Sequence, residues 1–365
     1  MPCERNKAIS ACRDMNSTVY KLDPLQDPRW TALVETHPHA SVFHTRGWME
    51  ALRRTYDYSP VAYTTSSPTG TLSNALVFAR VRSWITGRRI VSLPFSDHCE
   101  PLFESREELN FVLEYLQSEM DHREWRYLEV RPRNGSLAAS AKRFGFYSVA
   151  SYYLHCVDLC PSLESVFRLL DKNSVQRRVL HAGRAGVTEK CGRSKTLLDE
   201  FYNLVVLTRR RHHLPPQPYI WFQNVLDCLG DAAVIRTAYA KDGIPIASIL
   251  TLRFRNSVVY KYGGSDARFK SLGATPLLLW RAIEDAKANG ATEFDLGRSD
   301  EQDQKLVNFK NHWDKDPSRL LYWRYPAPQL SNNGDWQLRF AKLLLAGMPD
   351  SVLAAMGRLL YKHIG

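Results

Sequence analysis

A short loop at residues 270–275 has the composition of a phosphate-binding site. Its residues are Lys270, Ser271, Leu272, Gly273, Ala274 and Thr275, and a helix is expected to follow directly. The first N–H groups of a helix have no partners within it and lie at the positive end of its dipole, so they attract anions. Gly273 lets the backbone approach a ligand, while Lys261, Arg268 and Lys270 supply charge. The pattern predicts a pyrophosphate site, or else an ordinary turn between a strand and a helix.

Two carboxylates lie in the corresponding loop of the first half of the chain. This loop contains Asp97 and Glu100, has no glycine and lacks basic residues, so we expect it to bind no phosphorylated donor. The carboxylates could hold an acceptor amine or act as a general base; alternatively, they stabilise a turn and a helix start. His98 and Cys99 are not expected to form a nucleophile pair, because neighbours on a strand point to opposite faces.

Two further pairs of polar residues are candidates for a substrate site. Tyr260 and Tyr262 are two residues apart, so we expect them to share one face of a strand. One of them could reach the cleft as an acid or oxyanion donor; the alternative is packing. Asp295 lies in the next expected strand and Ser299 follows it. Both would lie near the donor thiol, where Asp295 could equally be structural.

Composition and charge restrict the class of protein. The chain has 365 residues, of which 44% are hydrophobic and 24% charged, as in folded globular proteins of about two domains. Its formal net charge of +11 favours an anionic partner. The start has no apolar signal segment and no stretch is long enough to span a bilayer, so we expect a cytoplasmic protein. The seven cysteines lack zinc-site spacing, so we expect no metal.

The second half of the chain has a clear order of expected elements. Alternating residues predict strands over 232–240, 244–253 and 257–262. A helix should begin with Thr275 as N-cap and Pro276 at its first position, and Gly290 should end it. A strand over 292–296 follows, and helices over 195–211 and 219–229 precede this group. This order predicts a mixed sheet, because a helix must join the last two strands.

The first half repeats this order. Expected strands and helices lie at 45–55, 60–65, 72–82, 89–93, 105–120 and 126–130, and a helical stretch from Leu163 to Arg184 joins the halves. The repeat predicts an α/β fold of two like domains, over residues 28–160 and 161–330. Residues 1–27 form an N-terminal extension, and residues 331–365 form a helical tail.

The loop and its surroundings resemble the GNAT superfamily of acyltransferases. Residues 270–275 are similar to the Arg/Gln-x-x-Gly-x-Gly/Ala coenzyme A loop, with Lys270 replacing Arg or Gln and Thr275 replacing the last small residue. The run YKYGGSDARFKSLGATPLLLWRAIEDAKANGATEFDLGRSD, followed by LVNFKNHW, resembles FemAB-like peptidyltransferases and related acyltransferases of exopolysaccharide and cell-envelope assembly. The segments FHTRGWMEAL and LPFSDHCEPL agree with this, and the resemblance covers about residues 30–325.

The resemblance implies a tandem of two GNAT-like domains that transfer an acyl group without a metal. The donor would be acyl-CoA, or alternatively aminoacyl-tRNA, and the acceptor an amine or hydroxyl of a small molecule, sugar or lipid-linked precursor. The degenerate first domain would lie on the acceptor side. Lys310, in an Asn-Phe-Lys motif, would stabilise developing charge. Lys310, Tyr262 and Asp97 form the expected catalytic set. Arg268 and residues 270–275 would bind the donor. The acceptor would be bound by Glu100, Tyr260, Asp295 and Ser299.

The basic residues and the amphipathic tail allow more than one kind of anionic partner. Residues 168–195, with Arg177 and Arg178, and Arg209–Arg211 could follow the phosphates of tRNA or of a lipid or sugar; a solvated helix face is the alternative. Residues 336–364 predict two amphipathic helices broken at Met348-Pro349, which would lie on the inner face of an anionic membrane or dock on protein. A non-catalytic membrane-associated scaffold is therefore a third hypothesis beside the two transferases.

Overall fold

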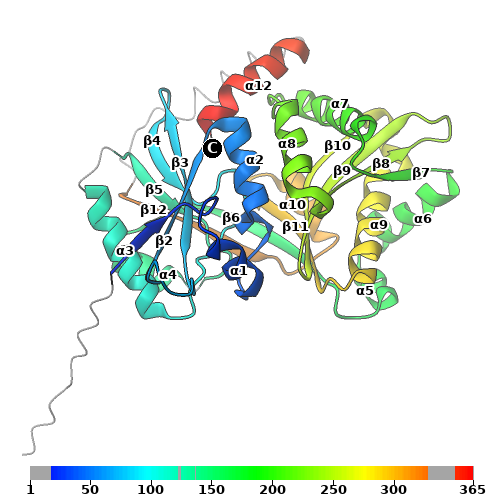
Figure 1. The fold of residues 1–365 in the computed structure, drawn as a ribbon. Helices are drawn as coiled ribbons and strands as arrows, with labels where there is room; N and C mark the ends of the chain where they lie inside the picture. The colour runs from blue at the N-terminus through cyan, green and yellow to red at the C-terminus, as the bar shows by residue number, and fades with distance from the viewer. Residues whose placement is uncertain (1–17, 122–124, 136, 328–349, 365) are drawn as a thin grey trace, which may run out of the picture.

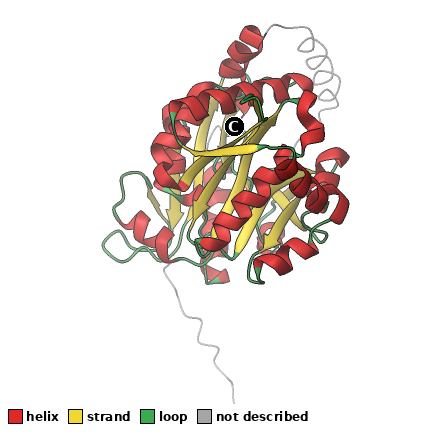
Figure 2. Ribbon diagram, turned by 90° about the vertical axis from the view of Figure 1, so that its right-hand side faces the viewer, coloured by secondary structure: helices red, strands yellow, loops and turns green. Residues whose placement is uncertain are grey.

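The computed structural model describes residues 18–121, 125–135, 137–327 and 350–364. These residues form a twelve-stranded mixed sheet with helices packed on both faces (Figures 1 and 2). The strand order is β1-β2-β3-β4-β5-β12-β6-β11-β10-β9-β8-β7. The predicted α/β fold with mixed sheets is confirmed.

The first half contains six strands and four α-helices among its described residues. They are β1 (Tyr20–Leu22), α1 (Arg29–Thr36), α2 (Arg46–Tyr56), β2 (Ser59–Thr64), β3 (Leu76–Ser83), β4 (Gly87–Val91), α3 (Arg106–Asp121), β5 (Tyr127–Val130), α4 (Leu137–Arg143) and β6 (Tyr147–Asp158). A short 3-10 turn, η1 (Val42–His44), precedes α2.

The second half repeats this pattern. Its elements are α5 (Leu163–Leu169), the π-helical turn η2 (Lys172–Gln176), α6 (Arg177–Arg184), β7 (Thr188–Gly192), α7 (Lys195–Arg211), α8 (Tyr219–Leu229), β8 (Ala233–Tyr239), β9 (Pro245–Phe254), β10 (Ser257–Ser265), the 3-10 turn η4 (Ala267–Leu272), α9 (Ala274–Ala288), β11 (Glu293–Asp300), α10 (Gln304–Asn311) and β12 (Ser318–Tyr325). Helix α12 (Asp350–Ile364) follows.

Each half of the sheet is completed by a strand from the other half. The first half reads β1-β2-β3-β4-β5-β12-β6 and the second reads β7-β8-β9-β10-β11-β6-β12, so β6 and β12 belong to both. Strand β12 pairs with β5, and β6 pairs with β11. The sheet is therefore continuous across the domain boundary predicted near Pro161, and the bounds 28–160 and 161–330 stay a prediction.

Two helical crossovers place the two candidate loops. Among the described strands, only β4–β5 and β10–β11 are parallel neighbours. Helix α3 joins the first pair and α9 joins the second, as parallel strands require. The carboxylate loop therefore follows β4, and the basic loop follows β10.

Apolar packing fixes the two halves against each other. Trp48 of α2 and Trp221 of α8 are fully buried and meet edge to face, with ring centroids 5.2 Å apart. On the opposite face of the second half, Leu278 and Ile283 of α9 are buried against the sheet. Edge-to-face aromatic pairs and apolar burial both stabilise such contacts, so the groups that line the junction are held in place.

The start of α9 differs from the prediction. The helix begins at Ala274, and Gly273 is its N-cap with a φ of +72°, so the assignment of Thr275 as N-cap is wrong. A left-handed residue between η4 and α9 requires glycine, and the helix starts two residues nearer the N-terminus than predicted. The helical stretch predicted over 163–184 is also interrupted by η2. Helices α7 and α8 match their predictions.

The described end of the tail docks on the first half. Tyr58 Oη donates to the carbonyls of Tyr361 and Lys362 at 3.0 Å each, and the Arg89 guanidinium donates to the His363 carbonyl at 2.7 Å. Of the two predicted tail helices, the one before Met348-Pro349 lies outside the described residues. Within the described part of the chain, no helix has the length and apolar character needed to cross a membrane.

We expect Gly264→Ala to destabilise the protein by about 1–3 kcal/mol, as overpacked cores do. A Cβ on Gly264 would lie 2.4–2.5 Å from the backbone of Leu204 and Val205 in α7, so the helix would have to move off β10. Gly183 of α6 is the matched control, because a Cβ there meets nothing within 4 Å. Gly183→Ala should gain about 0.5–1 kcal/mol. Urea unfolding measures both; equal stability of the two variants would contradict the packing.

Candidate active site

Strands β10 and β11 diverge and open a V-shaped gap in the sheet. They pair only from Ser257–Val259 to Glu293–Asp295, although β10 continues to Ser265 and β11 to Asp300. Each strand also has a register shift beside its other neighbour, between Tyr260 and Tyr262 and between Asp295 and Arg298. Backbone bulges of this kind bend a strand and commonly border active sites.

The carboxylate loop of the first half reaches the apex of this gap. Asp97 accepts two hydrogen bonds from Lys261 Nζ, both at 2.9 Å. A Cβ on Gly297 would lie 3.1 Å from Asp97 Oδ2, so only glycine leaves room for the carboxylate. Burial lowers the pKa of Lys261, and the adjacent Asp97 opposes that shift. The earlier assignment of Lys261 to a pyrophosphate site is therefore wrong: this lysine is buried in an ion pair.

A second carboxylate at the apex is paired with a histidine. Asp295 Oδ2 lies 3.1 Å from His98 Nε2, and Asp295 Oδ1 accepts from the Gly297 N–H at 2.6 Å. Burial alone would raise the pKa of Asp295, but the bond and charge of His98, with Arg133 and the Gly297 amide, lower it. Asp295 is therefore ionised and holds the His98 ring in one orientation.

Lys310 lies beside both carboxylates. Its side chain is 3% exposed, and Nζ donates to the carbonyls of Gly297 at 2.7 Å and Arg298 at 2.9 Å. Burial lowers the pKa of Lys310 to about 8, while the charges of Asp97 and Asp295 act in the other direction. Lys310 is therefore a buried lysine and not a solvated one.

The two tyrosines face different parts of the core, so the prediction that they share one face is wrong. Tyr262 packs with the cluster under α7 and α8, where its hydroxyl accepts from Trp221 Nε1 at 3.0 Å. Tyr260 packs with the cluster under α9, and burial raises its pKa to about 12. The register shift at Lys261 reverses the usual alternation between these two positions.

The basic loop is tightly packed from one side. A Cβ on Gly273 would lie 2.6 Å from the carbonyl oxygen of Arg178, so this glycine allows α6 to approach. The Arg268 side chain is hydrogen-bonded to Asp266, while Lys270 and Ser271 are exposed. Leu272 is half-buried against the core, Gly273 and Ala274 are buried, and Thr275 is half-buried.

Basic residues from separate parts of the sequence meet around this loop. Arg178 of α6 donates to the Lys270 carbonyl at 3.5 Å, and its neighbour Arg177 is exposed. Arg211, at the end of α7, donates to the Ser265 carbonyl at 3.4 Å. The structure therefore places the three basic segments on one surface, although the sequence separates them by as many as about 90 residues.

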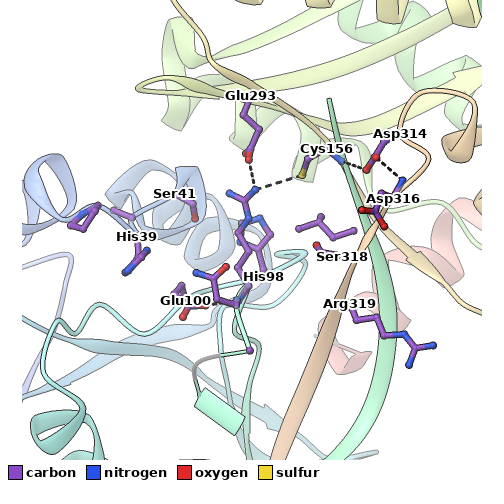
Figure 3. Close-up of a pocket in the computed structure, with 16 residues that line it drawn as sticks. His39, Ser41, His98, Glu100, Cys156, Glu293, Asp314, Asp316, Ser318 and Arg319 are labelled. Atoms are coloured by element: carbon purple, nitrogen blue, oxygen red, sulfur yellow. Dashed lines mark hydrogen bonds and ion pairs between the residues drawn. The ribbon is translucent and has the colours of Figure 1, made fainter. Parts of the chain in front are cut away.

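A cavity of about 470 Å³ opens on the other side of the apex, between the two halves (Figure 3). His98 and Glu100 lie on one wall, and Asp314, Asp316 and Ser318 on the other. Glu100 accepts from the backbone N–H groups of Arg133 and Asn134 at 2.6 and 2.9 Å. Ser299 is outside this cavity, and its buried hydroxyl has no hydrogen-bond partner among the described residues.

The structure thus places Asp97, Asp295 and Lys310 together with His98 and Lys261 around one apex. Arg177 and Arg178 lie by the basic loop and not at the cavity that Glu100 lines. No local pattern indicates the His98–Asp295 pair, because 197 positions separate the two residues. In the described part of the chain, no three His, Cys, Asp or Glu side chains are grouped as metal ligands.

Comparisons with known proteins identify the fold. Residues 172–311 match the acetyltransferase (GNAT) domain family. The chain is similar in structure to FemX, with a TM-score of 0.67 and 14% identity, covering 87% of this chain and 99% of that one. It also resembles a tandem GNAT protein of the clavulanic acid biosynthesis pathway, with a TM-score of 0.55, 11% identity and coverage of 86% and 99%.

A third similar structure is L-PGS from Bacillus licheniformis, with a TM-score of 0.52, 15% identity and coverage of 88% and 98%. No curated protein sequence matches the chain significantly. The likeness to solved structures concerns the fold, while the family domain concerns the half that contains β10, α9 and the basic loop. Residues 172–311 therefore form a GNAT acetyltransferase domain, and the fold of the chain is similar to that of FemX and of a tandem GNAT protein.

Proposed function

We propose that this protein transfers an acyl group from an acyl-CoA thioester to an amine or hydroxyl of a small-molecule, sugar or cell-envelope precursor. The observation that carries the proposal is the gap between β10 and β11, which has the basic loop at its mouth and Asp97, Asp295 and Lys310 at its apex. The first N–H groups of α9, with exposed Lys270 and Ser271, are suited to a pyrophosphate. Arg268 and Thr275 flank the same surface.

In this proposal, Lys310 stabilises the oxyanion that forms when the acceptor attacks the acyl carbonyl. An ammonium group has three N–H donors, and two of those on Lys310 bind backbone carbonyls. The third is left for the oxyanion, in a buried site where such a bond is strong. The carbon–sulfur bond then breaks, and the proton that the acceptor nitrogen or oxygen loses goes to the leaving thiolate. The acyl carbonyl of the donor lies beside Tyr262 and Lys310. The acceptor lies between the two halves, near Asp97 and Glu100.

Turnover with a panel of acyl-CoA thioesters tests the proposal. The assay measures release of the free thiol in the presence of amine and sugar acceptors. We expect saturable release with at least one thioester and a mass increase of one acyl group on the acceptor. Failure of the protein both to bind coenzyme A and to release thiol would overturn the assignment of the donor.

A second candidate donor is aminoacyl-tRNA, which is favoured by the basic surface around the loop. Arg177, Arg178 and Arg211 extend this surface well beyond the area that one pyrophosphate needs. Cationic surfaces of this kind bind nucleic-acid phosphates with strong salt dependence. The predicted cytoplasmic location and the predicted membrane contact of residues 336–364 fit either donor and stay predictions.

For the tRNA donor we expect Arg177→Glu with Arg178→Glu to weaken binding about uniformly among tRNA sequences. Loss of two phosphate contacts should reduce the slope of log K against log salt by about 1.4–1.8. Arg53→Glu with Arg54→Glu is the matched control, because it makes the same charge change on α2, in the other half. Filter binding at several salt concentrations measures the slopes. Equal slopes for both double variants would exclude this surface as a tRNA site.

A further inference from the structure

The turn between β3 and β4 presents two large apolar side chains to solvent. Trp84 is 87% exposed and Ile85 is 50% exposed. Helix α12 adds a third apolar side chain, Leu359, which is 70% exposed. We propose that these three residues dock the protein on an anionic lipid bilayer. The proposal goes beyond acyl transfer, because none of the three lines the cavity or belongs to the basic loop.

The three apolar side chains belong to one surface. Helix α12 lies beside β3 and β4 at the top of the molecule (Figure 1). The rings of Trp84 and His363 meet edge to face, with centroids 5.5 Å apart. Leu359 precedes His363 by one helical turn and lies on the same side of α12. Trp84 and Leu359 therefore flank His363, and together with Ile85 they form what we call the hairpin patch.

Hydrogen bonds hold the turn in its outward position. Ser83 Oγ accepts from the backbone N–H groups of Ile85 at 3.1 Å and of Thr86 at 2.9 Å. On the side of α12, Thr86 Oγ1 donates to the His363 carbonyl at 2.9 Å, and His363 Nδ1 lies 2.9 Å from Ser83 Oγ. Because the turn is fixed on both sides, Trp84 and Ile85 stay exposed until a partner covers them, and burial of such apolar area favours binding.

The charge around the hairpin patch fits an anionic surface. Residues 80–91 and 356–364 contain no acidic residue. The exposed basic side chains of these segments and of the start of β5 are Arg82, Arg88, Arg126, Arg358 and Lys362. Arg126 belongs to this group because it donates to the Thr86 carbonyl at 3.3 Å. An anionic leaflet attracts such cations, while apolar side chains enter its headgroup region, where tryptophan is enriched.

Two other partners fit the hairpin patch less well than a bilayer does. A second copy of the chain would bring the same cations against each other, because a two-fold contact pairs identical surfaces. A nucleic acid could stack a base on Trp84, but Ile85 and Leu359 are aliphatic and offer no ring for stacking. A bilayer uses the three apolar side chains and the surrounding cations together.

Binding of the full chain to lipid vesicles tests the proposal without any catalysis. The probes are vesicles of equal parts phosphatidylglycerol and phosphatidylcholine, and co-flotation measures the bound fraction of protein. We expect the wild type to bind these vesicles. Trp84→Ser with Ile85→Ser should bind them at least about tenfold more weakly, since burial of even one side chain of this size contributes about that factor.

Leu169→Ser with Ile244→Ser is the matched control for this double variant. It also removes two exposed apolar side chains, but from the second half of the chain, so it should bind vesicles like the wild type. Thermal melting followed by circular dichroism checks that both variants remain folded. Absence of wild-type binding, or equal binding by the two double variants, would overturn the proposal.

The cations of the hairpin patch have a test of their own. We expect Arg82→Gln with Lys362→Gln to weaken binding to the anionic vesicles about fivefold for each charge removed, and to leave binding to pure phosphatidylcholine unchanged. Lys241→Gln with Lys315→Gln is the matched control, because both lysines are exposed in the second half. Equal losses in the two double variants would mean that the net charge of the protein, and not this surface, determines the attraction, and would contradict the proposal.

Two further measurements on Trp84→Ser with Ile85→Ser distinguish the other occupants. Filter binding measures its affinity for tRNA, and sedimentation velocity measures its oligomeric state. We expect both to match the wild type. A variant that loses tRNA binding or self-association, but floats with vesicles like the wild type, would assign the hairpin patch to that partner and overturn the proposal.

Discussion

Replacing Lys310 by methionine is expected to lower kcat/KM for acyl transfer about 10²–10³-fold, the usual effect of removing one oxyanion donor. Nζ lies between the carbonyls of Gly297 and Arg298 and close to both apex carboxylates. Methionine fills the same volume but donates no hydrogen bond. Lys305→Met is the matched control, since Lys305 is exposed on the same helix, and it should retain full activity.

The pH dependence gives Lys310 a second test. Burial lowers its pKa to about 8, so the ammonium form is present below that pH and is lost above it. If Lys310 acts as a cation, kcat falls as the pH rises through about 8, and this basic limb is absent from Lys310→Gln. Thermal melting followed by circular dichroism checks that both variants remain folded. Wild-type kcat in a folded Lys310→Met protein would show that the lysine has only a structural role.

Asp97→Asn is expected to destabilise the protein by about 3–5 kcal/mol, because it leaves Lys261 as a buried charge without its ionic partner. The Lys261 side chain is 6% exposed and makes both of its 2.9 Å contacts with this carboxylate. Urea unfolding measures the loss. The same substitution should also reduce acyl transfer, since the pair lies at the apex of the gap.

A double variant separates the ion pair from other effects of the substitution. Asp97→Asn with Lys261→Met removes both charges, and replacing a buried pair as a whole often costs little. We therefore expect the double variant to be more stable than Asp97→Asn alone. If the stability lost in the double variant equals the sum of the losses in Asp97→Asn and Lys261→Met, the two side chains do not interact.

Elements with a strong local pattern were predictable from the sequence. Helices α7 and α8 have regular apolar spacing, and strands β8 and β9 are separated by the Asp242-Gly243 turn. Strands β6 and β12 were not predicted. Half of the residues of β6 are only half-buried, so the strand lacks clear alternation. Its pairing with β12 joins residues about 170 positions apart. An exchange of strands between halves has no local signature.

In the candidate site, too, residues in a local motif were predictable, whereas contacts between distant residues were not. The basic loop, Asp97 and Lys310 could be found because each lies in a recognisable segment. Lys261 was misassigned, since its partner Asp97 is 164 residues away, and the bulge that redirects Tyr260 and Tyr262 depends on the pairing of β10 with β9. The dyad of His98 and Asp295 likewise exists only once the first half fills the gap in the second.

Equilibrium binding of coenzyme A to the full chain tests the central claim most directly. Calorimetry should show one saturable site per chain at ligand concentrations up to about 1 mM, the upper end of ordinary KM values. Lys270→Glu, at the exposed edge of the loop, should weaken that site at least about tenfold, which corresponds to 1.4 kcal/mol. Absence of saturable binding, or binding that Lys270→Glu leaves unchanged, would contradict a donor site at the start of α9.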